Sequence, residues 1–209
     1  MSRRARQIND LKRNRAKQAS YDRVLIVCEG SKTEPNYFRE IIDHLKLNTA
    51  NVEVDGSSDS SPRSFVAHAI QRLQSDPDFD RVYCVFDKDE HTTYNEAVQR
   101  ILAYSKSPLY AILSVPCFEY WFLLHFEFTA RPYARSGKRS PADCVIGDLK
   151  RYLEAYEKGD RRLFQALRDK VELAIERSKR VHEQATKNQT DNPSTQVHLL
   201  VEYLQNLKK

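Results

Sequence analysis

Three carboxylates stand directly after apolar runs of sequence, where strand ends are expected. Glu29 follows the apolar run 24–28 and Asp87 follows the run 82–86, with Asp89 two residues further on. In an extended chain, residues i and i+2 point to one side, so Asp87 and Asp89 would face the same space. Mg²⁺ takes one or two carboxylates and keeps waters and substrate phosphate as its other ligands. A divalent ion held there would polarise a phosphodiester and lower the pKa of a bound water.

The same three acids also have a simpler interpretation as turn or helix-cap residues. An aspartate at a junction between strand and helix often caps the next helix. Three unpaired carboxylates crowded together would, however, repel one another without a cation. The pattern therefore favours a metal site, with Glu29 as a ligand or as a general acid/base.

Other side chains near these positions are further candidates. Glu34 lies in the first turn of a predicted helix, where an acid is also favourable next to the helix dipole. His91 follows Asp89 by two residues and is either a surface histidine or a proton donor, since its unperturbed pKa suits acid–base work. Trp121 and His125 share one face of an apolar helix predicted over 117–126, which by physics alone is typical of an aromatic stripe with a satisfied histidine.

The elements that must position these residues alternate along the chain. Apolar runs predict strands, and helical spacing of apolar residues predicts helices, in the order β-α-β-α-β-α-β that yields a mainly parallel four-stranded sheet. In such sheets ligands bind beyond the carboxyl ends of the strands, so the acids converge if the first and third strands are neighbours. The predicted strands are 23–28, 52–54, 81–86 and 110–113, the helices between them 33–45, 62–74 and 94–105, and three later helices 142–156, 160–186 and 193–207.

Positive charge is concentrated at the N-terminus. The chain carries a net charge of +5, whereas residues 1–20 contain seven Lys/Arg and one Asp. This segment is either a solvated terminal helix or an arm that binds phosphates with salt-sensitive, sequence-independent affinity. The basic loop 129–141 allows the same two interpretations. The nucleic-acid-binding candidates are Arg3, Arg4, Arg6, Lys12, Arg13, Arg15, Lys17, Lys32, Arg131 and Arg135, with Lys138 and Arg139 in the same loop.

Several classes of protein are excluded by composition. The four cysteines form no C-x-x-C pair, so we expect buried thiols, and neither G-x-x-x-x-G-K nor G-x-G-x-x-G is present. No apolar stretch approaches the ~20 residues of a membrane helix, and the basic N-terminus lacks a signal-peptide core. We expect a cytoplasmic α/β protein divided into a basic arm (1–20), an α/β core (21–127) and a basic loop with a helical extension (128–209).

A longer set of motifs resembles a known family. The segment 24–38 reads VLIVCEGSKTEPNYF, 85–91 reads VFDKDEH, 116–126 reads PCFEYWFLLHF, and 192–198 reads NPSTQVH. Together they resemble the RloB-like (AbiLii-like) proteins, whose core is similar to the toprim fold of topoisomerases, primases and OLD-type nucleases. Val115 departs from the family pattern, which has asparagine there.

The resemblance implies a function and a set of site residues. It implies a toprim-type Mg²⁺ (or Mn²⁺) site with Glu29 as the first-strand glutamate and Asp87 and Asp89 as the D-x-D pair. It also places Glu119 and His125 near the metal and implies a role in defence against phage with an ATPase partner. Thr195 and His198, by contrast, are expected to cap and pack a helix that has Pro193 in its first turn.

Two hypotheses of different class follow. The first is a Mg²⁺- or Mn²⁺-dependent endonuclease acting on DNA or RNA. The second is a non-catalytic toprim-like effector that binds nucleic acid or a partner ATPase. Strand joining or primer synthesis is a third, for which the 209 residues offer no added gate or polymerase domain. A homo-oligomer is compatible with each.

Overall fold

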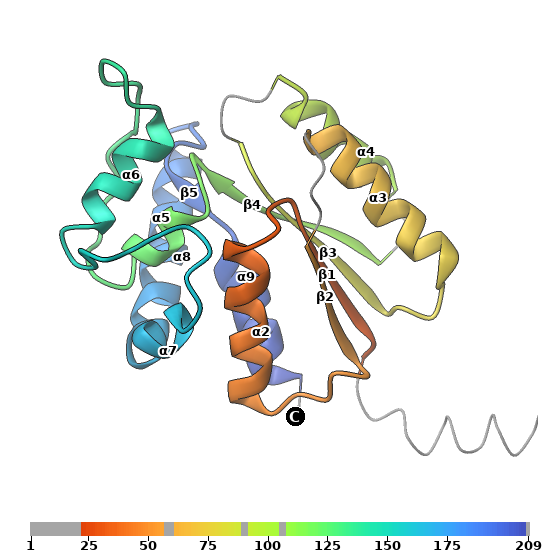
Figure 1. Cartoon of the computed structure of the whole chain (residues 1–209). Coiled ribbons are helices and arrows are strands. Elements are labelled where there is room, and N and C mark those ends of the chain that lie inside the picture. The colour runs from red at the N-terminus through yellow and green to blue at the C-terminus, as the bar shows by residue number, and fades with distance from the viewer. Residues whose placement is uncertain (1–21, 57–60, 89–91, 105–107, 208–209) are drawn as a thin grey trace, which may run out of the picture.

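A mainly parallel sheet forms the centre of the molecule (Figure 1). The computed structural model describes residues 22–56, 61–88, 92–104 and 108–207. Within these ranges five strands form one sheet in the order β2-β1-β3-β4-β5, parallel except for the antiparallel pair β4–β5. The strands are β1 (Val24–Cys28), β2 (Val52–Gly56), β3 (Arg81–Asp87), β4 (Leu109–Val115) and β5 (Ser194–Thr195).

The central strands are apolar because both faces of the sheet are covered. All five residues of β1 are buried, as expected for a parallel strand between two helical layers. Leu25 and Val27 pack with the helices on one face, whereas Ile26 and Cys28 pack with those on the other. Figure 1 shows α3 (Pro62–Ser75) and α4 (Tyr94–Ala103) on the first face.

The opposite face is covered by α2 (Thr33–Leu45) and α9 (Val197–Asn206) (Figure 1). Helix α2 buries Tyr37, Phe38 and Ile41, whose helical spacing predicted this element with its observed bounds. The α/β class, the mainly parallel sheet and the C-terminal helical extension are therefore confirmed. The sheet has five strands in place of the four predicted, because Ser194–Thr195 adds the short antiparallel strand β5 beside β4.

The helical extension packs into the same apolar core as α2. Its helix α6 begins with a capping box, in which Ser140 and Asp143 each bond the other's backbone N–H. The remaining elements of this part are α5 (Glu119–Leu123), α6 (Pro141–Leu149), α7 (Leu163–Leu167), the 3-10 turn η1 (Arg168–Lys170) and α8 (Val171–Lys187).

Three predicted helices of this part were wrong in extent. The one over 142–156 ends at Leu149, because the chain then leaves the helix as a loop that buries Tyr156. The one over 160–186 is divided into α7, η1 and α8. The last helix begins at Val197 and not at Pro193, because Thr195 pairs with Ser114 as a short strand along β4.

Two other sequence predictions concern the whole chain. The four cysteines are free, and Cys28, Cys84 and Cys117 are buried, as expected. Among the described residues no helix has the length and apolarity to span a bilayer.

Candidate functional site

Glu29 and Asp87 meet at the carboxyl edge of the sheet. Strands β1 and β3 are parallel neighbours, with Cys28 opposite Val85. Glu29 continues the pairing by donating its N–H to the Val85 carbonyl oxygen at 3.0 Å. The backbone N–H of Asp87 donates to Glu29 Oε2 at 3.3 Å. The neighbouring strands that the hypothesis required are therefore present, and the Glu29 carboxylate lies at the end of β3 where Asp87 stands.

Glu34 enters the same site from the first turn of α2. Its side chain is buried and lies against Gly30, since a Cβ atom added to Gly30 would stand 2.2 Å from Glu34 Oε2. A side chain at position 30 would therefore require the Glu34 carboxylate to move. Glu34 is thus a member of the acidic edge and not an exposed helix-dipole acid.

Glu119 is brought in by the start of α5. The backbone N–H of Phe118 donates to Asp87 Oδ2 at 3.0 Å, which joins this turn to the end of β3. Glu119 is 2% exposed, and its Oε1 accepts a hydrogen bond from the Tyr156 hydroxyl at 3.0 Å. We name Glu29, Glu34, Asp87 and Glu119 the acidic cluster.

Two members of the acidic cluster, Asp87 and Glu34, have a raised pKa. Burial raises the pKa of Asp87 well above its usual range, and the charges of Glu34, Glu119 and Glu29 add to this effect. Burial also raises the pKa of Glu34 to about 7, helped by Glu119 and opposed in part by Lys158. Both shifts show that negative charge is unfavourable here without a compensating cation.

Lys158 and Tyr156 are site residues that the sequence analysis missed. Lys158 Nζ lies 3.6 Å from Glu119 Oε1, the oxygen that Tyr156 also contacts. Burial alone would lower the pKa of Lys158, but the charge of Glu119 and the other acids outweighs it and the pKa is raised. These two residues lie in an irregular loop with no helical spacing or motif, so the sequence carries no local signal for them.

The donor set suits a hard divalent cation. Its members offer oxygen atoms only, which is the chemistry that Mg²⁺ and Mn²⁺ select. Asp89 and His91 lie outside the described residues, and within those residues no three His, Cys, Asp or Glu side chains form a ready metal-binding group. Glu29 and Asp87 are the described residues at the predicted metal position, and the raised pKa of Asp87 is the observation that agrees with a cation there.

The structure places His125 in the apolar core, away from the acidic cluster. Its ring is fully buried, its Nδ1 lies 3.0 Å from the Trp121 carbonyl oxygen, and its Nε2 has no hydrogen-bond partner in the described structure. Burial lowers the pKa of His125 to about 4, and the charges acting on it are those of Lys170 and Arg177. His125 is therefore a neutral core histidine next to α8 and not a contact of the acidic cluster.

Thr195 and His198 belong to a buried polar network. Ser114 Oγ lies 3.0 Å from Thr195 Oγ1, and Ser178 Oγ donates to the Thr195 carbonyl oxygen at 2.9 Å and lies 2.8 Å from His198 Nδ1. This network ties α8 and α9 to the edge of β4. Packing explains both residues, although Thr195 acts from a strand and not from the expected helix cap. Val115, beside them in β4, is buried and fills an apolar position.

The candidate phosphate-binding residues are spread over the surface. Lys32 is exposed at the start of α2. Arg131 lies over the Tyr133 ring and pairs with Asp148, so its charge is already compensated. Arg135 is exposed, directly before the β-bridge between Ser136 and Arg139. The seven cations of residues 1–20 lie outside the described residues.

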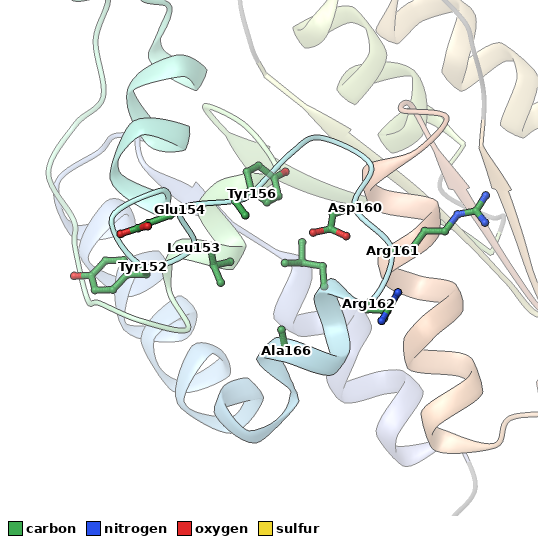
Figure 2. A pocket seen from close by; sticks show the side chains of 10 residues that line it. Tyr152, Leu153, Glu154, Tyr156, Asp160, Arg161, Arg162 and Ala166 are labelled. Carbon is green, nitrogen blue, oxygen red and sulfur yellow. The ribbon is translucent and has the colours of Figure 1, made fainter.

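A pocket of about 540 Å³ lies next to the loop between Tyr156 and Asp160 (Figure 2). Tyr156 and Asp160 come from this loop, and Tyr152 and Leu153 form the far wall. Tyr156 lines this pocket and also contacts Glu119, so the pocket and the acidic cluster share one side chain.

The fold and the acidic edge define the class: an α/β protein whose parallel sheet ends in a group of carboxylates contributed by β1, α2, β3 and α5. Residues 24–204 match the model of the RloB-like protein family. The chain belongs to this family, as its motifs predicted. No curated protein and no solved structure matches the chain.

Proposed function

We propose that the protein is a metal-dependent nuclease of the toprim type that hydrolyses phosphodiesters of nucleic acid. The observation that carries the proposal is the carboxyl-edge pair Glu29 and Asp87, crowded by Glu34 and Glu119. Burial and neighbouring carboxylates raise the pKa of Asp87 and of Glu34, which is costly to a fold, so the presence of these acids at a ligand-binding edge favours a functional role.

The residues of the chain have distinct tasks in this proposal. Glu29 and Asp87, with Asp89, would hold the divalent ion, and the Phe118 N–H fixes Asp87 by its hydrogen bond to Oδ2. When bound, the ion would polarise the phosphodiester and lower the pKa of an attacking water. Glu34, with its pKa near 7, can take up the proton that this water loses. The water oxygen forms a bond to phosphorus as one ester P–O bond breaks, and the leaving oxygen takes a proton from solvent, so that one end carries a phosphate and the other a hydroxyl.

The cellular role follows the family resemblance. We place the protein in the cytoplasm as the effector of a defence system against phage, acting with an ATPase partner. DNA and RNA, including tRNA, are both substrates that this chemistry can cut.

The test is a cleavage assay with the full chain. Wild type, Asp87→Ala and the control Asp43→Ala are incubated with plasmid, single-stranded DNA and total tRNA, in Mn²⁺, in Mg²⁺ and in chelator. Asp43 is an exposed acid at the far end of α2 and should be dispensable. We expect cleavage by wild type and Asp43→Ala that requires the metal ion, and none by Asp87→Ala. Equal products from Asp87→Ala, or cleavage that persists in chelator, would refute the proposal.

A second candidate is a non-catalytic effector that binds nucleic acid or a partner ATPase. It is favoured by the observation that Lys158 and a protonated Glu34 can balance the acidic cluster without a metal. This candidate predicts no cleavage under any condition, and binding that is the same for wild type and Asp87→Ala.

A further inference from the structure

Residues 156–159 form a strap that lies across the start of α2. At one end, the Tyr156 hydroxyl donates to Glu119 Oε1 at 3.0 Å. At the other end, Gly159 donates its N–H to Thr33 Oγ1 at 2.9 Å, and its carbonyl oxygen accepts a hydrogen bond from Asn36 at 2.9 Å. The strap is therefore anchored on both sides of Lys158, to α5 and to α2.

The path of the strap depends on a glycine. Gly159 has a φ of +85°, in the left-handed region that other residues rarely adopt. A Cβ atom there would stand 2.9 Å from Lys32 Cβ, so a larger residue would displace the strap from α2. Such a specific path indicates that the position of Lys158 matters.

The pair of Lys158 with Glu119 does not account for this arrangement. The Lys158 side chain is 64% exposed and its Nζ is 3.6 Å from Glu119 Oε1. Glu119 is buried, but the lysine end of the pair is exposed, so water screens its charge and the lysine loses conformational freedom to make the contact. An ammonium has three donors, and one carboxylate oxygen at this distance uses at most one of them. The ammonium therefore keeps donors for a ligand that reaches the acidic cluster.

A phosphodiester is such a ligand, and it needs a cation here. Its negative charge would be repelled by Glu29, Asp87 and Glu119, and a metal ion shared among carboxylates offsets only part of that repulsion. We propose that Lys158 is a substrate-binding residue whose ammonium contacts the non-bridging oxygens of the phosphodiester at the acidic cluster. This inference rests on the proposed nuclease function, and it makes the C-terminal extension part of the site.

The experiment compares three variants of the full chain. Lys158→Gln removes the charge, and Lys158→Arg keeps it. Lys179→Gln is the matched control, because Lys179 also pairs with a carboxylate, that of Glu202, but on α8 and α9. For each protein we measure kcat and KM for cleavage in Mn²⁺, the dissociation constant for Mn²⁺ alone, and the binding of 12-nucleotide DNA and RNA in Ca²⁺.

We expect Lys158→Gln to lower kcat/KM about 100-fold, as the loss of one donor to a developing phosphate charge does elsewhere. Lys158→Arg should remain within about tenfold of wild type, and Lys179→Gln should equal it. Lys158→Gln should bind Mn²⁺ as tightly as wild type or up to about tenfold more tightly, because a repelling charge near the carboxylates is gone. Its binding of the oligonucleotides should weaken.

Two results would overturn the inference. If Lys158→Gln matches Lys179→Gln in every measurement, Lys158 does not contact the substrate. If Lys158→Gln binds Mn²⁺ more weakly, the lysine supports the carboxylates and not the phosphate. The proposed nuclease function can fail independently of this inference. If wild type cleaves no nucleic acid, but Lys158→Gln is the only variant that weakens oligonucleotide binding, then the contact of Lys158 with phosphate is supported and the nuclease function is refuted.

Discussion

The carboxylates of the acidic cluster oppose the folding of the chain that carries them. Asp87 accepts a backbone hydrogen bond from Phe118, but burial and the negative charges of Glu34, Glu119 and Glu29 raise its pKa. A carboxylate that serves architecture has the reverse surroundings. Asp148, for instance, accepts from the Tyr133 hydroxyl at 2.8 Å and pairs with Arg131.

This contrast predicts the stability of Asp87→Asn. The change keeps the acceptor for the Phe118 N–H and removes a crowded charge, so the melting temperature in chelator should stay equal or rise. With saturating Mg²⁺ the order should reverse, because wild type gains stability from the ion and the variant gains less. Melting curves in both conditions give the answer, together with a cleavage assay in which the variant should be inactive.

The control for this prediction is Asp148→Asn. It should melt at a lower temperature in both conditions, with a free energy of unfolding about 1–3 kcal/mol smaller, since it weakens a half-buried hydrogen bond to a charged group. If Asp87→Asn behaves like Asp148→Asn, and Mg²⁺ shifts neither protein, Asp87 is architectural. The same measurements on Asp89→Asn test the predicted ligand that lies outside the described residues.

The raised pKa of Glu34 makes stability depend on pH. The folded protein holds a proton on Glu34 up to a pKa of about 7, against 4.5 for an ordinary glutamate. Between pH 4.5 and pH 7 the folded state therefore binds more protons than the unfolded state. The free energy of unfolding is highest below pH 4.5 and falls as the pH rises through 7. The loss amounts to roughly 3 kcal/mol, and the raised pKa of Asp87 adds in the same direction.

Urea unfolding in chelator from pH 5 to pH 8 measures this effect. We expect the free energy of unfolding of wild type to fall over this range, and that of Glu34→Gln to fall much less. Mg²⁺ should flatten the wild-type curve by favouring the carboxylates. A wild-type curve that rises with pH, or an equal slope in the variant, would contradict the assignment.

At the scale of elements, the site depends on where loops are anchored. The start of α5 is bonded to the end of β3, and residues 156–159 are bonded to the start of α2. Each connection places one charged side chain, Glu119 or Lys158, beside the ends of β1 and β3. The helices behind them supply the apolar core that keeps these anchors in place.

Gly137 and Gly159 both have a positive φ, and substituting each of them distinguishes the effect of backbone strain from the effect of moving the strap. Gly137 has a φ of +61° and nothing near its missing side chain, whereas Gly159 would contact Lys32. Gly137→Ala should cost only the left-handed strain, roughly 1 kcal/mol, and leave cleavage unchanged. Gly159→Ala should cost roughly 2 kcal/mol or more and lower kcat/KM as Lys158→Gln does. Chemical unfolding and the cleavage assay measure both, and equal effects of the two changes would show that the strap position is unimportant.

At the scale of the whole molecule, positive charge and the acidic cluster are separate along the chain. Residues 1–20 carry seven of the 34 Lys/Arg and one of the 29 Asp/Glu. The remaining 189 residues therefore sum to −1, with the carboxylates of the site among them. A polyanion thus needs the arm or the basic loop to approach a molecule that is otherwise close to neutral.

Deleting residues 1–20 should leave the fold intact and weaken nucleic-acid binding mainly at low salt. The reason is that binding by such cations is driven by the release of counterions, which salt suppresses. Binding to a labelled oligonucleotide between 50 and 300 mM salt would show a smaller salt dependence for the truncated protein, with an unchanged melting temperature as the control. The same affinity and salt dependence in both proteins would mean that the arm is not used.

The sequence by itself predicted the central strands and α2, and it named every member of the acidic cluster as a candidate, Glu119 only through the family resemblance. Continuous apolar runs predicted β1 and β3 because burial on both faces requires them, and helical spacing predicted α2. Glu29 and Asp87 could be predicted because the end of an apolar run marks the end of a strand, and that end can be read from the sequence alone. The family, too, could be read from motifs within short segments.

Only the tertiary structure decided which distant residues share the site. No local sequence pattern encodes the contacts that form the site. These contacts place β1 beside β3, the Glu34 carboxylate against Gly30, and the start of α5, with Glu119, next to Asp87. Lys158 is the clearest case, since it meets Glu119 from a loop without periodicity. His125 shows the reverse, because its spacing with Trp121 was right but packing placed it beside α8. Sequence periodicity shows which face of one segment is buried and which is exposed to solvent. A site, by contrast, consists of side chains and backbone groups from several segments, which only the packing of those segments brings together.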